Sequence, residues 1–332
     1  MLRAAVLGGG SWGTTVASIV AQNTPTQLWA RNADVVNSIN DHNENNVYLP
    51  GLKLNPTLTA TNDLAQAVSN ADLIIMGVPS KAMRATLKDV MEHIRAWVPI
   101  ISLAKGFELG TRLRMTEIIK EVAPGHPPGV LTGPNLAREI VQGYAAASVL
   151  AMEDEVIVDR LRPIFESSLF RVYSNTDMVG CELGGALKNV IAIASGMGDG
   201  SGAGENTRSA VITRGLAEIT RLGVAMGGRP ETFAGLAGLG DLMATCTSTL
   251  SRNHTVGVAL GKGRTVQEII DEMNQVAEGV NSSKIVYEFS QEYNIRMPIV
   301  EEVYKVCHQG STARRAFRGL LRMEHGSEAE PG

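Results

Sequence analysis

A single lysine stands in a long stretch that has no other charge. Residues 183–198 are apolar, small or hydroxylic, apart from the amide of Asn189 and the ammonium group of Lys188. A helix over this stretch would be buried on nearly every face. Burial disfavours the ammonium form and lowers its pKa, and a lysine becomes a general acid or base near neutral pH in this way. Two structural alternatives stay open, in which Lys188 reaches solvent from a helix end or pairs with a buried carboxylate such as Glu182.

A lone aspartate occurs in a second apolar stretch. Residues 232–246 are apolar, glycine or hydroxylic, and Asp241 is their only charge. The glycines of this stretch permit close approach of two backbones. Asp241 therefore has two interpretations, a role in the chemistry or the N-cap of a helix, which is a frequent position for aspartate after glycine. The two roles are compatible.

A polar triplet follows the second stretch. Ser251, Arg252 and Asn253 offer a hydroxyl, a guanidinium fork and an amide, a set that suits a phosphate monoester. Taken alone, the triplet is also an ordinary polar turn. The adjacent His254 has no acid partner or nucleophile spaced with it, so we interpret it as structural or exposed rather than catalytic.

Three glycines near the amino terminus indicate a nucleotide site. A short apolar run over residues 3–7 leads into Gly8, Gly10 and Gly13, and a helix-like pattern follows. This strand, turn and helix match G-x-G-x-x-G, in which the first glycine allows the tight turn, the second lets pyrophosphate approach, and the third allows helix-to-strand packing. The amides of the helix N-terminus would face the phosphates. The context favours cofactor binding over a purely structural turn.

The residue after the second predicted strand bears on the choice of cofactor. Sites that prefer NAD usually place an acid there, on the ribose 2′-hydroxyl, whereas this chain has Arg31. An arginine suits the 2′-phosphate of NADP, so the sequence favours NADP(H), with NAD(H) as a second possibility. The alternative is a solvated arginine at a strand end.

Further strands extend the predicted sheet. Apolar runs over residues 72–78, 98–103 and 130–132 are typical of buried parallel strands, and residues 145–151 and 170–174 suggest closing strands. Ligands bind beyond the carboxyl ends of such strands. This rule places Lys105 and the turn that holds Gly133, Asn135 and Ala137 over the cofactor, although Lys105 alone could be a surface lysine.

The alternation of strands and helices stops near Asn175. We therefore predict an α/β fold in which residues 1–175 form a Rossmann-type, doubly wound dinucleotide-binding domain. Residues 176–332 would form an all-helical substrate-binding and catalytic domain. Within it, the glycine-rich residues 196–205 are predicted to be a flexible loop, followed by an amphipathic helix over 209–222.

Composition limits the classes of partner. The chain has 332 residues, 44% of them hydrophobic, and a formal net charge of −4, which argues against a general electrostatic grip on nucleic acid or anionic membrane. It shows no apolar run of membrane-spanning length and no signal-peptide pattern. The three cysteines lack metal-type spacing and suit a reducing compartment. We therefore expect a cytoplasmic protein with small-molecule partners, no metal site and no integral membrane segment.

Taken together, these residues resemble the bacterial NAD(P)-dependent glycerol-3-phosphate dehydrogenases. The resemblance covers almost the whole chain and rests on the order and spacing of short motifs: residues 8–13, 48–51, 104–106, 133–137, 182–189, 213–215, 232–241, 251–253 and 278–279. Two features depart from the family pattern. The third residue of the Gly133 turn is Asn135 rather than the common serine or threonine, and residues 196–206 look longer and richer in glycine.

The resemblance implies roles for individual residues. Lys188 would be the proton acceptor in alcohol oxidation, with Asp241 orienting it. The substrate site would comprise Lys105, Gly133, Asn135, Lys188, Asn189, Asp241, Thr245, Ser251, Arg252 and Asn253. The cofactor would contact Ser11, Trp12, Arg31, Lys105, Ala137, Arg252, Val276 and Glu278 beside the glycine turn.

The resemblance also implies a reaction. It is reversible hydride transfer between the nicotinamide and sn-glycerol 3-phosphate, which gives dihydroxyacetone phosphate, a phosphorylated triose. The family suggests a homodimer and a biosynthetic role that supplies glycerol 3-phosphate for phospholipids. Two competing hypotheses are a related dehydrogenase acting on a hydroxy acid, which should want a carboxylate clamp, and an NADP-binding redox sensor without turnover, which would have no use for a buried Lys188 and Asp241.

Overall fold

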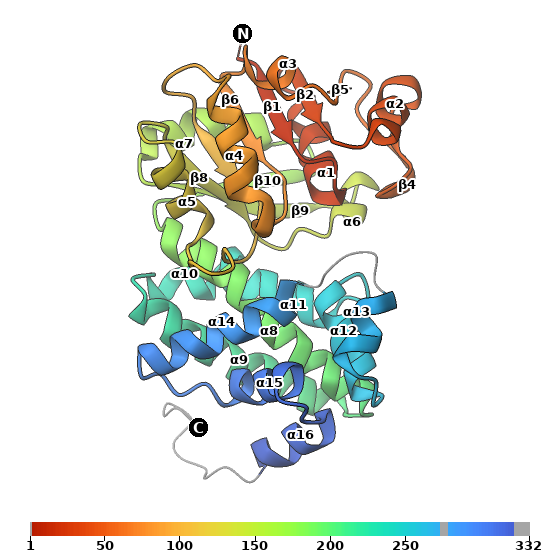
Figure 1. Ribbon diagram of the computed structural model, residues 1–332, viewed down its shortest axis with the longest axis vertical. Helices are drawn as coiled ribbons and strands as arrows, with labels where there is room; N and C mark the ends of the chain where they lie inside the picture. The colour runs from red at the N-terminus through yellow and green to blue at the C-terminus, as the bar shows by residue number, and fades with distance from the viewer. Residues whose placement is uncertain (1, 273–277, 322–332) are drawn as a thin grey trace. The chain divides into compact units, whose positions relative to one another are not determined.

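A computed structural model describes residues 2–272 and 278–321 of the chain. The chain divides into two compact units, Met1–Met178 and Val179–Gly332. The first carries a sheet with helices, and the second is built of helices (Figure 1).

Unit 1 is organised around one eight-stranded sheet in the described part of the chain. The strands lie in the order β10-β9-β8-β7-β6-β1-β2-β5. Their bounds are β1 Ala4–Leu7, β2 Thr26–Trp29, β5 Thr59–Thr61, β6 Leu73–Met76, β7 Ile100–Ser102, β8 Pro128–Thr132, β9 Ala146–Met152 and β10 Phe170–Asn175. The order reverses between β1 and β6, which is the switch point where such sheets bind ligands. The predicted Rossmann-type fold is confirmed.

The closing strands depart from a purely parallel sheet. Neighbouring strands are parallel along the sheet in the order β5, β2, β1, β6, β7 and β8. The next strand, β9, runs antiparallel to β8, and β10 runs parallel to β9. The sheet is therefore mixed at one edge. The short strand β5 and the hairpin of β3 (Glu44–Asn45) and β4 (Leu49–Lys53) have no counterpart among the predicted elements.

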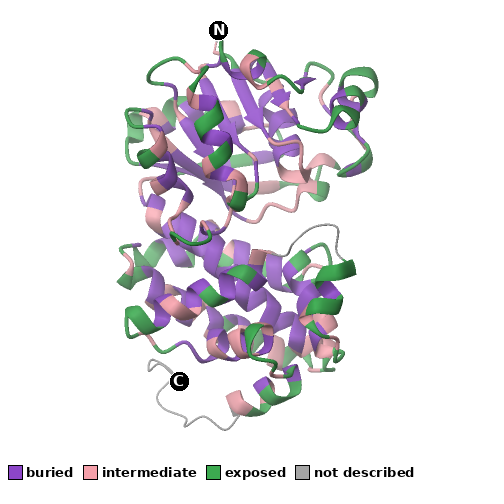
Figure 2. Ribbon diagram, in the orientation of Figure 1, coloured by how far each residue is buried: buried purple, intermediate pink, exposed green. Residues whose placement is uncertain are grey.

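The central strands are apolar because helices cover both faces of the sheet. All four residues of β1 and of β6 are buried. Ala4 and Val6 belong to one apolar cluster, together with residues of α1 (Ser11–Val20). Ala5 and Leu7 face a second cluster with residues of α4 (Met83–Met91) and α5 (Met115–Val122). Figure 2 shows the strands buried and the outer helix surfaces exposed. The remaining helices of this unit are α2 Ala33–His42, α3 Leu64–Val68, α6 Ala137–Val141 and α7 Glu155–Leu161, with short 3₁₀ turns at Ser80–Ala82 and Arg162–Phe165.

Unit 2 is built around the long helix α8, Met178–Gly200. Its other elements are α9 Glu205–Ala225, α10 Pro230–Ala234, a π-helical turn Leu236–Gly240, α11 Asp241–Thr247, α12 Arg252–Gly261, α13 Val266–Glu272, α14 Glu278–Glu292, α15 Pro298–His308 and α16 Ala313–Leu321. By length and composition α8 could cross a membrane, since an 18-residue segment of it has a mean hydropathy of 1.2. However, 94% of that segment is buried inside the protein. This burial is that of a core helix.

The predicted flexible loop over residues 196–205 is wrong in its first half. Helix α8 continues to Gly200, and α9 begins at Glu205. The glycines serve a helix crossing instead. A Cβ on Gly196 would lie 2.2 Å from the His254 carbonyl oxygen, and a Cβ on Gly257 would lie 2.2 Å from that of Ile193. Helices α8 and α12 therefore touch backbone to backbone, which only glycine permits.

A buried carboxylate joins α9 to α15. Glu218 accepts hydrogen bonds from the backbone amides of Ile299 (2.9 Å) and Val300 (3.3 Å), at the N-terminus of α15. Burial raises the pKa of Glu218 to about 7, although these amides and the charges of Arg221 and Arg214 act in the opposite direction. Glu218 is thus a structural anchor between two helices.

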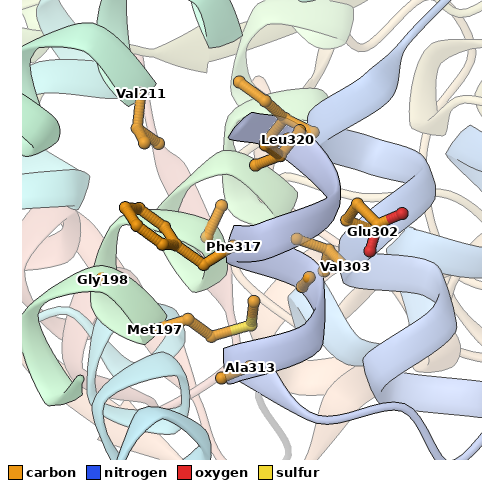
Figure 3. Close-up of a pocket in the computed structure, with 11 residues that line it drawn as sticks. Met197, Gly198, Val211, Glu302, Val303, Ala313, Phe317 and Leu320 are labelled. Carbon is orange, nitrogen blue, oxygen red and sulfur yellow. The ribbon is translucent and has the colours of Figure 1, made fainter. Parts of the chain in front are cut away.

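The last helix leaves an apolar pocket beside α8. Figure 3 shows that Phe317 and Leu320 of α16 line it together with Met197, Val211 and Val303 from α8, α9 and α15. Glu302 is the one charged residue among its lining residues, and it is ion-paired with Lys305 at 2.8 Å. The pocket is a gap in the packing between the apolar face of α16 and helices α8, α9 and α15.

Candidate active site

The glycine turn of unit 1 has the close contacts that its spacing predicts. Gly8 has φ +127°, and a Cβ there would lie 2.6 Å from the carbonyl carbon of Gly77, at the end of β6. A Cβ on Gly13 would lie 2.1 Å from the Gly8 carbonyl oxygen. By contrast, a Cβ on Gly10 would meet nothing within 4 Å. The turn is thus packed at its first and third glycines and open at its second, where a pyrophosphate would approach.

The N-terminus of α1 fits an anion. Its N-cap is Gly10, no side chain caps it, and its first turn has no acidic residue. Helix N-terminal amides left in this state attract phosphate groups. In the first turn, Ser11 donates a hydrogen bond from Oγ to the Tyr48 carbonyl oxygen (3.1 Å), and the Trp12 ring lies 6.3 Å from that of Phe170. The residues present therefore fit a dinucleotide.

Asn45 is a supporting residue that sequence reasoning missed. Its buried amide donates to the Gly9 carbonyl oxygen (2.9 Å) and to Thr14 Oγ1 (2.8 Å), and it accepts from the Tyr48 amide (3.1 Å). These bonds fasten the β3–β4 hairpin to the glycine turn. The nearby 48–51 motif was the only signal, because a single asparagine in a polar run gives no sign that it is buried.

Arg31 and Lys105 follow β2 and β7. Arg31 is exposed, directly before Asn32, whose side chain caps α2 by accepting from the Asp34 amide (2.8 Å). The ammonium group of Lys105 donates to the Gly133 carbonyl oxygen (2.7 Å). Lys105 therefore lies against the turn after β8 rather than extending from a surface.

That turn leaves one buried donor without a partner. Gly133 has φ +133°, and Asn135 Oδ1 accepts from Ser148 Oγ at 3.2 Å. Asn135 Nδ2 is buried and makes no hydrogen bond with any residue that the structure describes. A buried unpaired amide costs free energy, so this group fits a ligand acceptor. Ala137, at the start of α6, accepts a weak bond from Thr15 Oγ1 (3.4 Å) and so lies beside α1.

In unit 2, Lys188 is buried in the middle of α8. Its Nζ lies 3.2 Å from Asp241 Oδ1, and the two side chains are 6% and 3% exposed. Nζ also donates to Thr245 Oγ1 (2.5 Å), whose hydroxyl donates to the Asp241 carbonyl oxygen (2.6 Å). Of the two structural alternatives for Lys188, pairing with a buried carboxylate is confirmed, although the partner is Asp241 rather than Glu182, and the side chain does not reach solvent. A compensated buried charge can exchange a proton with a ligand placed beside it.

A close helix contact sets this ion pair. A Cβ on Gly184, one turn before Lys188, would lie 2.6 Å from the carbonyl oxygen of Ala237, one turn before Asp241. The π-helical turn therefore packs directly on α8. The N-cap interpretation of Asp241 is wrong, because Gly240 holds that position and α11 begins at Asp241.

The polar triplet forms the N-terminus of α12. Ser251 is the N-cap and accepts from the His254 amide (3.3 Å), and Arg252 is exposed at the first position of the helix. Asn253 donates to Asn189 Oδ1 (2.9 Å) and accepts from the Gly279 amide (3.0 Å). These bonds bring Asn189, the neighbour of Lys188, against α12. Glu278 begins α14, and Val276 lies outside the described residues.

His254 is buried, as a structural interpretation requires, but it has an acid partner that its spacing did not reveal. Its Nε2 lies 2.8 Å from Asp199 Oδ2, and its side chain is 8% exposed. Asp199 lies near the end of α8, in the stretch that the sequence assigned to a loop. A helical reading of residues 196–200 would have been needed to find this pair.

Two family models match the chain in succession. The model described as NAD-dependent glycerol-3-phosphate dehydrogenase N-terminus matches residues 3–158, and the one described as the C-terminus of the same family matches residues 177–318. Together they include the glycine turn of unit 1 and the Lys188–Asp241 pair of unit 2.

Relatives agree along almost the whole chain. A protein of Sphingopyxis alaskensis named glycerol-3-phosphate dehydrogenase [NAD(P)+] 2 is 61% identical, over 100% of this chain and 99% of its own length. A glycerol-3-phosphate dehydrogenase [NAD(P)+] of Mycobacterium avium is 53% identical over 98% and 96%. The crystal structure of glycerol-3-phosphate dehydrogenase from Coxiella burnetii superposes with a TM-score of 0.91 at 36% identity, over 97% of this chain and 99% of that one.

Proposed function

This chain belongs to the NAD-dependent glycerol-3-phosphate dehydrogenase family, and from that premise we propose how its own residues act in the reaction. The chain is an NAD(P)-dependent oxidoreductase that interconverts dihydroxyacetone phosphate and sn-glycerol 3-phosphate. When bound, the nicotinamide cofactor accepts or supplies the hydride. The chain itself must hold the cofactor, orient the substrate and move one proton.

Lys188 is the proton-transfer group in our proposal. The observation that carries it is the buried contact of Lys188 Nζ with Asp241 and Thr245. During reduction, Lys188 donates a proton to the carbonyl oxygen of dihydroxyacetone phosphate. During oxidation, it takes the proton of the substrate hydroxyl. Asp241 orients the ammonium group, and the Thr245 hydroxyl fixes the spacing between the two.

The substrate phosphate is assigned to the N-terminus of α12. Arg252 provides the charge and the fork, and Ser251 and Asn253 fix the turn. The remaining substrate contacts proposed are Lys105, Gly133, Asn135 and Asn189. The unpartnered Asn135 Nδ2 supports this set, since a substrate oxygen would satisfy it.

The cofactor is assigned to the glycine turn of unit 1. Gly10 leaves room for pyrophosphate, and the uncapped start of α1 attracts its charge. Ser11, Trp12, Arg31, Lys105, Ala137, Arg252, Val276 and Glu278 complete the proposed set. The exposed Arg31 supports use of NADPH at least as well as NADH.

The cellular role is also a proposal. Reduction of dihydroxyacetone phosphate would supply glycerol 3-phosphate for glycerophospholipid synthesis in the cytoplasm, by a homodimer. Cys181, Cys246 and Cys307 form no disulfide within the part of the chain that the structure describes, which supports a reducing compartment.

Substrate choice provides the direct test. We expect the purified protein to oxidise NADPH with dihydroxyacetone phosphate, and to do so at least about 100-fold faster in kcat/KM than with glyoxylate or a β-keto acid, because those lack the phosphate. Absorbance at the NADPH band measures all three. Faster turnover of either acid would favour the hydroxy-acid hypothesis.

A further inference from the structure

A charged network lies behind the triplet Ser251, Arg252 and Asn253. Asp199, near the end of α8, accepts on Oδ2 from His254 Nε2 at 2.8 Å and on Oδ1 from Arg208 Nε at 3.0 Å. Arg208, on α9, also binds Glu205 at 2.7 Å. The pKa of Arg208 is raised, first through its hydrogen bond with Asp199. None of these four side chains has a part in the reaction described above.

The network is built as a clamp on one helix end. The Asp199 carboxylate lies near the C-terminus of α8, where the helix dipole disfavours a negative charge. The Arg208 guanidinium and the His254 imidazole bind it there. His254 is 8% exposed and Asp199 is 17% exposed, so their contact is largely shielded from water. A hydrogen bond with this degree of shielding is worth more than an exposed one.

Two residues in the first turn of α12, Asn253 and His254, both bond to side chains of α8. The His254 amide donates to Ser251 Oγ, so the ring and the N-cap belong to the same turn. Asn253 binds Asn189 on α8. The exposed Arg252 is the first residue of α12, between Ser251 and Asn253 in sequence. The glycine crossing of α8 and α12 brings the two backbones together beside His254, since a Cβ on Gly196 would lie 2.2 Å from the His254 carbonyl oxygen, and these polar bonds then fasten the first turn of α12 to α8.

We propose that His254 is a positioning residue for phosphate binding: held by Asp199, it sets the orientation of the α12 N-terminus and thereby of Arg252. The inference rests on the proposed assignment of the substrate phosphate to Ser251, Arg252 and Asn253. His254 does not touch the substrate. Its loss should weaken binding of dihydroxyacetone phosphate while leaving the proton transfer by Lys188 intact.

The test compares two buried histidines that undergo the same change. His254→Phe removes the bond to Asp199 and keeps a ring, and His126→Phe removes a bond from a buried imidazole to the Val98 carbonyl oxygen (2.9 Å) in unit 1. We expect His254→Phe to raise KM for dihydroxyacetone phosphate roughly tenfold, with kcat within about twofold of wild type. We expect His126→Phe to lower the thermal midpoint and leave KM unchanged.

Rescue separates positioning from general stability. His254→Gln retains a donor that can reach Asp199, and we expect its KM to return to within about threefold of wild type. Asp199→Leu removes the acceptor and should raise KM as His254→Phe does, and the double variant should be no worse than either single one, because both act through one bond. If His254→Phe does not fold, Asp199→Leu decides, with His254→Gln as its near-wild-type comparison. Wild-type KM in Asp199→Leu, or an equal rise in His126→Phe, would overturn the inference.

A further variant distinguishes failure of the proposed phosphate site from failure of the proposed role of His254. Arg252→Lys retains the charge and loses the fork, so its KM should rise sharply if the phosphate binds there. Unchanged KM in Arg252→Lys would refute the proposed phosphate site itself. A raised KM in Arg252→Lys together with wild-type KM in His254→Phe would refute only the role of His254.

Discussion

The candidate nucleotide site of unit 1 and the candidate catalytic residues of unit 2 differ in what they are made of. In unit 1 the nucleotide cradle is made of backbone: glycines, the uncapped amides of α1 and the open space at Gly10. In unit 2 the groups that we propose for the chemistry are side-chain charges, and Lys188 and Asp241 are 6% and 3% exposed. A backbone cradle suits a large anion whose position matters more than its reactivity, whereas a proton must move to and from one atom. The difference indicates that cofactor binding and chemistry should respond to different kinds of substitution.

The largest expected effect is loss of the buried ammonium group. Lys188→Ala should lower kcat by about 10²- to 10⁴-fold while NADPH affinity stays close to wild type, because the nucleotide cradle lies in unit 1. Turnover and NADPH fluorescence titration on one folded sample measure both. Lys284→Ala, which removes an exposed lysine of α14, is the matched control.

Removing Lys188 also removes the positive charge that lies 3.2 Å from the buried Asp241 carboxylate, at a cost of about 3–5 kcal/mol. The double variant Lys188→Ala/Asp241→Asn relieves this and should recover stability but not turnover. Near-normal kcat in folded Lys188→Ala protein would move the proton acceptor to Lys105.

Glu218 is a second buried ionisable side chain of unit 2, and we expect it to affect stability rather than catalysis. Its folded pKa is raised to about 7 from 4.5. Below pH 4.5 both states bind the proton, and between pH 4.5 and 7 only the folded state does, so stability falls as pH rises through this window. The loss by pH 7 should be on the order of 3 kcal/mol.

Glu218→Gln should remove this dependence without changing kcat. Calorimetric midpoints from pH 5 to 8 for wild type, Glu218→Gln and the exposed control Glu231→Gln would show it. Parallel pH profiles for wild type and Glu218→Gln would contradict the assignment, and a large fall in kcat would make Glu218 more than an anchor.

The glycine turn offers a paired test of the backbone cradle. Gly10→Ala places a methyl group in open space, so the fold should be unaffected while the Kd for NADPH rises at least about tenfold, or about 1.4 kcal/mol. Gly13→Ala places the same group 2.1 Å from a carbonyl oxygen and should lower the thermal midpoint. Wild-type NADPH affinity in Gly10→Ala would show that pyrophosphate binds elsewhere.

The smallest expected effect concerns the one charged side chain proposed for the NADP phosphate. Because Arg31 is exposed, Arg31→Asp should shift the kcat/KM ratio towards NADH by only about two- to fivefold. Arg171→Asp makes the same charge change at an exposed position of β10. A wild-type enzyme that clearly prefers NADH would overturn the interpretation of Arg31.

The same contrast explains what the sequence could predict. The glycine turn is contained in six residues, so its strand, turn and helix can be recognised locally. Lys188 and Asp241 can each be found as a lone ion in an apolar stretch, but their pairing depends on the contact between Gly184 and Ala237, which no local pattern shows.

The errors have the same origin. Gly196 and Gly200 were interpreted as loop residues because glycine is a poor helix former, and the partner backbone of α12 that stabilises their helix lies far along the chain. The bond between His254 and Asp199 cannot be predicted from the sequence for the same reason, because Asp199 lies in this stretch. Strand β5 has three residues, two of them threonine, and is too short to show an alternating pattern.

The burial of α8 has a consequence for synthesis of the chain. Lys188 and its hydrogen-bond partner Thr245 are 57 residues apart, so α8 leaves the ribosome well before the segments that cover it. Until α11 and α12 are made, a stretch apolar enough to enter a membrane stays uncovered, with a lysine that has no counter-ion. That lysine disfavours insertion into lipid by about 2.5–3.5 kcal/mol. Lys188, which we propose for proton transfer, would thus also help to keep α8 of the nascent chain out of the membrane.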